Sequence, residues 1–257
     1  CLAYLICTGY PKVHATMQKL TWVQRLKIME GAARGLAHIH DNSHISGNLM
    51  KGQMLHIHGD IKSSNILLGK DMQAYIADFG VCRLTAWMNT SFNSSGQRED
   101  DSRLKKSTVR PVGIRSSFYR PPEAASVEAG NGIAIVLRGA TQKWDVYAFG
   151  VVLMEVLTGK SPDAQMASSA GIELVPWVRS TMEESRSINH ILDPNILGQT
   201  SACDLTIPPV GLVVPESVSS MLELAMSCTS PVPDRRPRMK YVIDAIQKAL
   251  ISSSRSI

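Results

Sequence analysis

Apolar residues recur at helical spacing from Thr21 onward, and this pattern predicts a long helix near the start of the chain. Steps of four and three residues place these positions on one face of a helix: Trp22, Leu26, Met29, Ala33, Leu36 and His40. Thr21 and Gln24 fit a capping box, in which each side chain bonds the backbone N–H of the other residue. We therefore expect a helix of about five turns with one buried stripe.

Three more helices are expected in the second half of the chain. Between Trp144 and Leu157 nearly every position is apolar, which is typical of a buried helix, and Gly159 follows where a capping glycine is expected. Two amphipathic helices come last. Their apolar residues are Val218, Met221, Leu222, Ala225 and Cys228 in one, and Met239, Val242, Ile243, Ile246 and Leu250 in the other.

Short strand-like segments lie between the first helix and the middle of the chain. They cover residues 55–58, 66–68 and 74–77 and are separated by polar turns. Residues 85–117 form a polar stretch rich in Ser, Thr, Lys and Arg, and a connection of that length is usually functional or disordered. The pattern predicts a mainly α fold of the α+β family, with a few short strands.

The composition is typical of a soluble globular protein, with 44% hydrophobic and 19% charged residues. A net charge of +5 is too small to indicate nucleic-acid binding by itself. No apolar run approaches the roughly 20 residues of a membrane span, so we expect none in this chain. The five cysteines are scattered without a C-x-x-C pair, which predicts free thiols in a reducing cytosol.

Residues 58–80 contain the groups that phosphoryl transfer requires. The reaction needs an acceptor hydroxyl held in line and metal ions that neutralise charge on the phosphates. One carboxylate can orient and deprotonate the hydroxyl, and a second carboxylate and an amide oxygen can hold Mg²⁺. Asp60, Asp78 and Asn65 are of the right types for these three roles.

Five segments, in order, resemble motifs of eukaryotic protein kinases. The first two resemble the catalytic loop and the metal-binding motif of that family. The segments are HGDIKSSN at 58–65, DFG at 78–80, YRPPE at 119–123, DVYAFG at 145–150 and DRRP at 234–237. The strings GAARGLAHIH and TQKWDVYAFGVVLMEVLTGKSP resemble plant leucine-rich-repeat receptor-like Ser/Thr kinases in particular. The resemblance covers roughly residues 20–250.

The resemblance implies ATP and Mg²⁺ as cofactors and assigns roles to residues of the site. Asp60 would be the catalytic base, and Lys62 would contact the transferring phosphate. Asn65 and Asp78 would ligate Mg²⁺, and adenine would lie on Leu67. A basic residue two positions after the catalytic Asp resembles the Ser/Thr-kinase pattern.

Further residues of the motifs are implied to hold or regulate the site. His58 would pack against Phe79 in a regulatory stack beside Gly80. Gly59 stands where many kinases carry an Arg that receives an activation-loop phosphate, so we do not expect switching by that ion pair.

Two more contacts are implied to anchor the loops of the site. Asp145 would anchor the backbone of the catalytic loop. Arg236 and Glu123 would form a buried ion pair.

The resemblance also divides the chain into parts. Residues 1–20 would be a hinge remnant, 21–251 the large C-terminal lobe and 252–257 a tail, with the catalytic loop at 58–65 and the activation segment at 78–123. Upstream of Thr21 there is no G-x-G-x-x-G loop, strand Lys or helix Glu, so we expect the small N-terminal lobe to be missing. Residues 43–54 and 132–139 resemble insertions.

A metal site built from histidines and a nucleic-acid-binding surface are two alternative interpretations with less support in the sequence. His56 and His58 would share a strand face, but no Cys or further His is spaced for a tetrahedral metal site. A run of basic residues could be a nucleic-acid surface. It comprises Arg98, Arg103, Lys105, Lys106, Arg110, Arg115 and Arg120. However, acidic residues are interspersed in this run, and it lacks the aromatic residues on which bases would stack. A solvated activation loop is the better interpretation, with Thr90, Ser107 and Thr108 among its candidate phosphorylation sites.

Two functions remain open at this stage. The first is an ATP- and Mg²⁺-dependent Ser/Thr kinase domain with protein substrates, on the cytosolic side of the plasma membrane as part of a receptor kinase. The second is a truncated or pseudokinase lobe that docks on kinase or receptor partners without catalysis. The chain alone is expected to be soluble and cytoplasmic, with no nucleic-acid partner.

Overall fold

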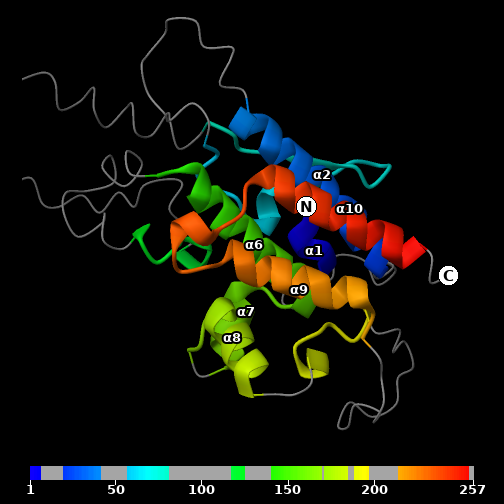
Figure 1. The fold of residues 1–257 in the computed structure, drawn as a ribbon, viewed down its shortest axis with the longest axis vertical. Coiled ribbons are helices and arrows are strands. Elements are labelled where there is room, and N and C mark those ends of the chain that lie inside the picture. The colour runs from blue at the N-terminus through cyan, green and yellow to red at the C-terminus, as the bar shows by residue number, and fades with distance from the viewer. Residues whose placement is uncertain are drawn as a thin grey trace, which may run out of the picture.

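A computed structural model describes residues 1–6, 20–41, 57–80, 117–124, 140–169, 171–184, 188–196 and 214–254. This part of the chain is mainly helical. Helices α2 and α10 lie side by side, α6 and α9 pack together in the middle, and α7 and α8 lie below them (Figure 1). The helices are α1 (Leu2–Ile6), α2 (Trp22–Asp41), α6 (Gln142–Thr158), α7 (Pro162–Ser168), α8 (Leu174–Glu184), α9 (Glu216–Cys228) and α10 (Met239–Ser254).

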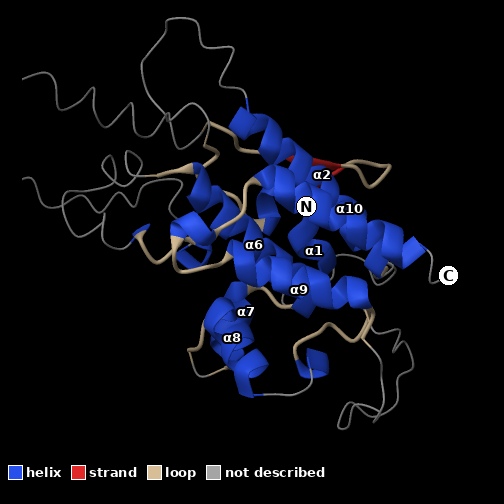
Figure 2. Cartoon of the chain, viewed as in Figure 1, coloured by secondary structure: helices blue, strands red, loops and turns tan. Residues whose placement is uncertain are grey.

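Short elements complete the described fold. Strands β1 (Ile66–Leu68) and β2 (Ala74–Ile76) form an antiparallel hairpin beside α2 (Figure 2). The single-turn helices are η3 (Ser63–Asn65), η4 (Ser117–Tyr119), η5 (Ile188–His190) and η6 (Pro233–Arg235). The strands expected at 66–68 and 74–77 are therefore confirmed. The strand expected at 55–58 is wrong for residues 57 and 58, which form no strand, and residues 55 and 56 lie outside the described ranges.

The capping box at the start of α2 is present. The backbone N–H of Thr21 donates to Gln24 Oε1 at 2.9 Å, and the N–H of Gln24 donates to Thr21 Oγ1 at 3.3 Å. The expected stripe is buried from Leu26 to His40, with Trp22 partly buried at its start. This amphipathic stripe packs α2 against α10 and β2.

Helix α6 is the buried centre of the described fold. All its residues from Asp145 to Thr158 are buried, as the apolar run predicts. Gly159 ends it in the left-handed conformation, with φ 68°, and its N–H donates to the carbonyl of Glu155 at 2.9 Å. Only glycine adopts such an angle without steric cost, so the capping role expected for Gly159 is confirmed.

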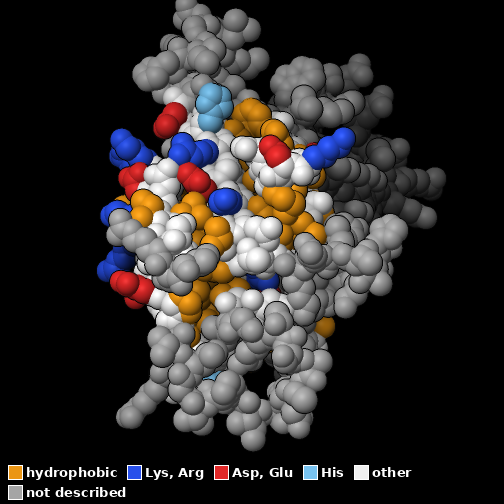
Figure 3. Space-filling view, turned by 90° about the vertical axis from the view of Figure 1, so that its right-hand side faces the viewer, with side chains coloured by type: hydrophobic (Ala, Val, Ile, Leu, Met, Phe, Trp, Pro, Cys, Tyr) orange, Lys and Arg blue, Asp and Glu red, His pale blue; other side chains and the backbone are white. Residues whose placement is uncertain are grey.

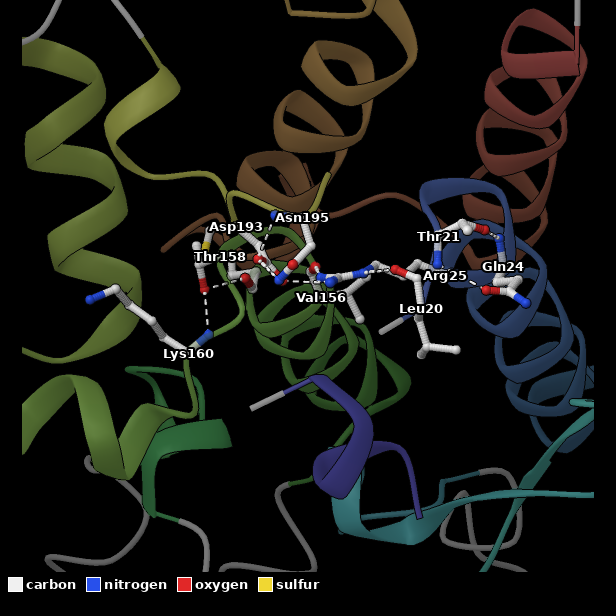
Figure 4. Close-up of polar contacts among 10 residues, drawn as sticks. Leu20, Thr21, Gln24, Arg25, Val156, Thr158, Lys160, Asp193 and Asn195 are labelled. Carbon is white, nitrogen blue, oxygen red and sulfur yellow. Dashed lines mark hydrogen bonds and ion pairs between the residues drawn. The ribbon is translucent and has the colours of Figure 1, made fainter. Parts of the chain in front are cut away.

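A buried arginine ties α2 to the end of α6 (Figure 4). Arg25 donates through Nη1 to the carbonyl of Val156 at 2.6 Å, through Nε to that of Leu20 at 3.3 Å, and pairs through Nη2 with Asp193 Oδ2 at 2.5 Å. Asp193 in turn donates its backbone N–H to Leu157 at 2.8 Å. A buried charge is tolerated only when paired and hydrogen-bonded, and this network satisfies that condition.

Several features fall outside the expectations or outside the described residues. Helices α1, α7 and α8 had no counterpart in the sequence prediction, and Leu2 and Ala3 of α1 are buried. The segments 43–54 and 132–139, His56, and the basic run apart from Arg120 lie outside the described ranges. Within those ranges, no helix is both long and apolar enough to cross a membrane.

Candidate active site

Asp145, in the first turn of α6, holds the loop that carries Asp60. We call residues 57–65 the Asp60 loop. Asp145 is 1% exposed; its Oδ1 accepts the backbone N–H of Gly59 and its Oδ2 that of His58, both at 2.8 Å. His40 of α2 contacts the same Oδ2 through Nε2 at 2.9 Å. The buried helix α6 thus fixes the start of the Asp60 loop, which is the contact expected for Asp145.

His58 connects the Asp60 loop to the segment before Asp78. Its Nδ1 accepts the backbone N–H of Asp60 at 3.2 Å, and its Nε2 lies 2.9 Å from the carbonyl of Ala77. Because Nδ1 accepts, the ring proton belongs on Nε2, where it donates to Ala77. The ring centroid lies 6.0 Å from that of Phe79, with the planes tilted by 49°. The two rings expected to pack together are therefore in contact, in a tilted arrangement.

Asp60, Lys62 and Asn65 are in direct contact. Asp60 Oδ2 accepts from Lys62 Nζ at 2.6 Å and from Asn65 Nδ2 at 3.2 Å, and Nδ2 also donates to the carbonyl of Asp60 at 2.9 Å. These contacts leave Oδ1 of Asp60 and the amide oxygen of Asn65 without a partner in the described part of the chain. Both oxygens are therefore available to a ligand or substrate.

Asp78 enters the same region through a backbone contact. The N–H of Ala77 donates to the carbonyl of Asn65 at 2.8 Å, so Asp78 follows immediately after the point where the two segments meet. Asp78 is exposed, and its carboxylate has no partner among the described residues. Its φ of 65° is unusual for a residue with a side chain, and such strained backbone is concentrated at functional sites.

The donor set of this region fits magnesium. Mg²⁺ is usually held by one or two carboxylates, with water and substrate phosphates completing its octahedron, and Asp78 and Asn65 supply hard oxygen atoms of that kind. No group of three or more His, Cys, Asp or Glu that could hold a metal by itself exists within the described ranges. A metal held by Asp78 and Asn65 would take its remaining ligands from water or from a bound phosphate.

An apolar surface adjoins these polar groups on the hairpin. Leu67 pairs with Tyr75 across the two strands, and their side chains are 45% and 57% exposed. Phe79 is 46% exposed, and Gly80 follows it with φ 89°. Leu67 therefore stands where an apolar ring could lie on it, two residues after Asn65.

The described residues on one face of the molecule show a mixture of charges. On the face shown in Figure 3, Lys and Arg side chains are interspersed with Asp and Glu, with apolar patches between them. A nucleic-acid footprint would show basic residues gathered on one face or stripe. The described residues on this face do not have that arrangement.

Arg236 fixes the segment that ends at Glu123. Its Nη1 and Nη2 pair with the two carboxylate oxygens of Glu123 at 2.6 and 2.7 Å. The Arg236 side chain is fully buried and that of Glu123 is 25% exposed. Arg236 also donates to the carbonyls of Ser230 and Lys143 and lies 5.0 Å from the ring centroid of Tyr147. The expected ion pair is present, buried on the arginine side and partly open at the carboxylate.

Glu155 is a buried residue of this region that the motifs did not identify. It is fully buried in α6; its Oε1 accepts from Ser63 Oγ at 2.9 Å and its Oε2 from the hydroxyl of Tyr119 at 2.8 Å. The signal available in the sequence was an acidic residue inside the otherwise apolar run 146–157. Such a residue requires a buried hydrogen-bond partner.

Most of the chain resembles known proteins in sequence. The family model described as the protein kinase domain matches residues 6–246. The match does not separate the two lobes of that domain, so the expectation that the small N-terminal lobe is missing stays a prediction.

The relatives of this chain include receptor-like kinases of Arabidopsis thaliana. A probable inactive leucine-rich repeat receptor-like protein kinase is 32% identical over 91% of this chain and 28% of its own length. An LRR receptor-like serine/threonine-protein kinase is 33% identical over 86% of this chain and 17% of its own length. A third, a leucine-rich repeat receptor-like protein kinase, is 31% identical over 91% of this chain and 29% of its own length. The chain thus spans less than a third of the length of these relatives.

Proposed function

The chain belongs to the protein kinase domain family, and we propose that it is a Ser/Thr kinase domain that binds ATP with Mg²⁺ at the Asp60 loop and Asp78. The observation that carries the proposal is the meeting of two segments, the Asp60 loop and the segment that ends at Asp78. Asp60 contacts Asn65 directly, and the bond from Ala77 to Asn65 brings Asp78 to the same place.

Each residue has a role that follows from its contacts. ATP with Mg²⁺ supplies the transferable phosphoryl group and neutralises its charge. Asp60 orients the acceptor hydroxyl and accepts its proton at Oδ1, because Oδ2 is already bound by Lys62 and Asn65. Lys62, held beside Asp60, presents a positive charge toward the transferring phosphate. Asn65 and Asp78 provide oxygen ligands for the metal.

The cellular context is proposed from the relatives. These relatives are named as receptor-like kinases with leucine-rich repeats, so we place this domain on the cytosolic side of the plasma membrane in a longer receptor kinase. Its partners would be protein substrates and other kinases or receptors. Lys62, two positions after Asp60, favours serine and threonine as acceptors.

A non-catalytic docking module is the second candidate function. Several relatives are named as probable inactive receptor kinases, and the pattern G-x-G-x-x-G does not occur in these 257 residues. Without a covering loop, the nucleotide phosphates would be open to water, where electrostatic stabilisation is weaker. The retention of Asp60, Lys62, Asn65 and Asp78 favours nucleotide binding over docking alone.

Titration calorimetry with a non-hydrolysable ATP analogue tests the proposal. We expect binding that requires Mg²⁺ and that weakens by about tenfold or more in Asp78→Asn, because a neutral amide is a poorer ligand than a carboxylate. Asp163→Asn, an exposed acidic residue of α7, is the matched control and should bind as the unaltered chain does. Binding that is independent of Mg²⁺ or insensitive to Asp78→Asn would contradict the metal site. A complete lack of binding would favour the docking module.

A further inference from the structure

We propose that Glu155 is a positioning residue that fixes the turn at Tyr119 to the Asp60 loop through Ser63. The inference rests on the proposed function, in which Asp60 receives the acceptor hydroxyl, because Ser63 belongs to the Asp60 loop. Ser63 lies three residues after Asp60, and its hydroxyl is 3.4 Å from that of Tyr119. The turn is therefore a neighbour of the Asp60 loop.

The contacts join three segments that are distant in the sequence. Ser63 donates to one oxygen of Glu155 at 2.9 Å and Tyr119 donates to the other at 2.8 Å. Ser63 is 2% exposed and Glu155 is fully buried. Since both carboxylate oxygens accept from hydroxyls, one side chain of α6 satisfies and orients two side chains that belong to different loops.

Burial makes this arrangement rigid. A carboxylate taken out of water is costly unless hydrogen bonds replace its hydration, and bonds to an ionised acceptor are stronger than neutral ones. Glu155 also lies in the last turn of α6, whose residues from Asp145 to Thr158 are all buried. Its carboxylate therefore has little freedom to move, and Ser63 and Tyr119 must adjust to it.

Helix α6 thereby holds the site at two separate points. Asp145 fixes the start of the Asp60 loop through His58 and Gly59, and Glu155 fixes Ser63 near its end. The second point also includes Tyr119, which is not among the residues proposed above to bind the nucleotide or its metal. We therefore expect that loss of the Glu155 contacts loosens the acceptor side of the site and leaves the metal ligands in place.

Fluorine NMR of the full chain labelled with 3-fluorotyrosine tests this coupling. The Tyr119 resonance is identified by its loss in Tyr119→Phe, with Tyr241→Phe as the exposed control. We expect Ser63→Ala and Glu155→Gln each to shift that resonance, whereas Ser220→Ala, at an exposed serine of α9, leaves it unchanged. In the Glu155→Gln background, Ser63→Ala should cause a smaller further shift, because only the 3.4 Å contact between the two hydroxyls remains. An unchanged Tyr119 resonance in Ser63→Ala would overturn the inference.

Two further readouts separate positioning from general destabilisation. Amide exchange over residues 118–124 should accelerate by about tenfold in Glu155→Gln, as expected for loss of a hydrogen bond to a charged group. The affinity for Mg²⁺ and the ATP analogue should stay within about twofold, whereas Asp78→Asn lowers it. Equal losses of affinity in Glu155→Gln and Asp78→Asn would overturn the inference. A chain that binds no nucleotide would refute the proposed function, while resonance shifts and exchange would still decide the role of Glu155.

Discussion

The carboxylate of Asp145 accepts the backbone N–H of Gly59 at 2.8 Å, across a sequence separation of 86 residues. Gly59 has φ 82°, a conformation that residues with a side chain seldom adopt. The N–H of the preceding residue, His58, bonds the other oxygen of Asp145. A single buried acid thus serves as the acceptor for two successive loop amides that would otherwise lose their hydrogen bonds to water.

Removal of this acid should loosen the Asp60 loop. Asp145→Ala leaves two largely buried N–H groups unpaired, and we expect a loss of about 3 kcal/mol or more in the free energy of unfolding. Asp145→Asn keeps one acceptor oxygen and should lose less. Urea unfolding measures the stability, and amide exchange at His58 and Gly59 shows whether the loop itself is released. A loss no larger than that of Asp163→Ala, at the surface of α7, would contradict this account.

Removal of the Glu123 carboxylate should destabilise the fold, because it leaves the buried Arg236 without its ion-pair partner. In Glu123→Ala, the buried Arg236 loses its carboxylate, and unpairing a buried ion of this kind costs about 3–5 kcal/mol; the 25% exposure of Glu123 places the expected loss toward the lower end. Arg34→Ala, which breaks an exposed pair with Glu30 on α2, should cost less than about 0.5 kcal/mol. Chemical unfolding of both variants makes the comparison. Similar small losses would mean that Arg236 is held by the carbonyls of Ser230 and Lys143 alone.

The elements that the sequence predicted are those with a long, regular pattern. Helix α2 has a capping box and a stripe of about five turns, and α6 is apolar throughout, so both could be recognised locally. Helix α7 is short, although Ser161 caps it and Pro162 occupies its first position, and α8 buries only Leu174, Val175 and Val178. So few apolar positions do not define a period, which is why these helices were missed.

The candidate site could be predicted only as far as its motifs extend. Resemblance placed Asp60, Asn65 and Asp78 in one region because their segments are recognisable. The pairing of Arg25 with Asp193, 168 residues apart, has no local pattern, and neither has the meeting of Ser63 with Glu155. Such contacts depend on how α6 packs against the rest of the chain, and that packing is a property of the whole fold.

Two glycine substitutions should have opposite effects on stability. A Cβ atom at Gly150 of α6 would lie 2.7 Å from Cys228 Cβ and 2.8 Å from Thr229 Cγ2, so Gly150→Ala should force α6 and α9 apart and cost about 1–3 kcal/mol. A Cβ atom at Gly35 of α2 would meet Ile76 at 3.4 Å, which is ordinary contact. Gly35→Ala should gain about 0.5–1 kcal/mol through helix propensity. Thermal melting of the two variants checks the signs, and a stabilised Gly150→Ala would refute the close packing of these helices.

Cys228 should make the fold less stable at alkaline pH. Burial raises the pKa of its thiol from 9.0 to about 12, although Arg236 and Lys143 act in the opposite direction. Above pH 9 the unfolded chain releases this proton while the folded chain retains it, so the contribution of the thiol to stability falls by about 1.4 kcal/mol per pH unit. It is fully present below pH 9.

Cys228→Ala isolates this effect. The variant should be less stable than the unaltered chain at pH 7.5 by about 1 kcal/mol or more, because it leaves a small cavity. The difference should shrink as the pH rises from 9 to 10.5, since alanine has no proton to retain. Tyr147, whose pKa is also raised by burial, is common to both proteins and cancels in the comparison. A difference in unfolding free energy between the two proteins that stays constant from pH 9 to 10.5 would contradict the prediction.

Phosphoryl transfer by the 257-residue chain alone should be undetectable. Its acids and amide are the residues proposed above to hold a metal and a nucleotide, but the glycine-rich loop and its strand lysine, which cover and orient the phosphates in the family, do not occur in these residues. Catalysis depends on donors fixed around a water-excluded site, and without that loop and lysine the phosphates would be open to water. Incorporation of γ-phosphate from labelled ATP into a Ser/Thr peptide should therefore not exceed that of Asp60→Asn. Transfer that is clearly above the Asp60→Asn background would show that these residues form a complete catalytic site.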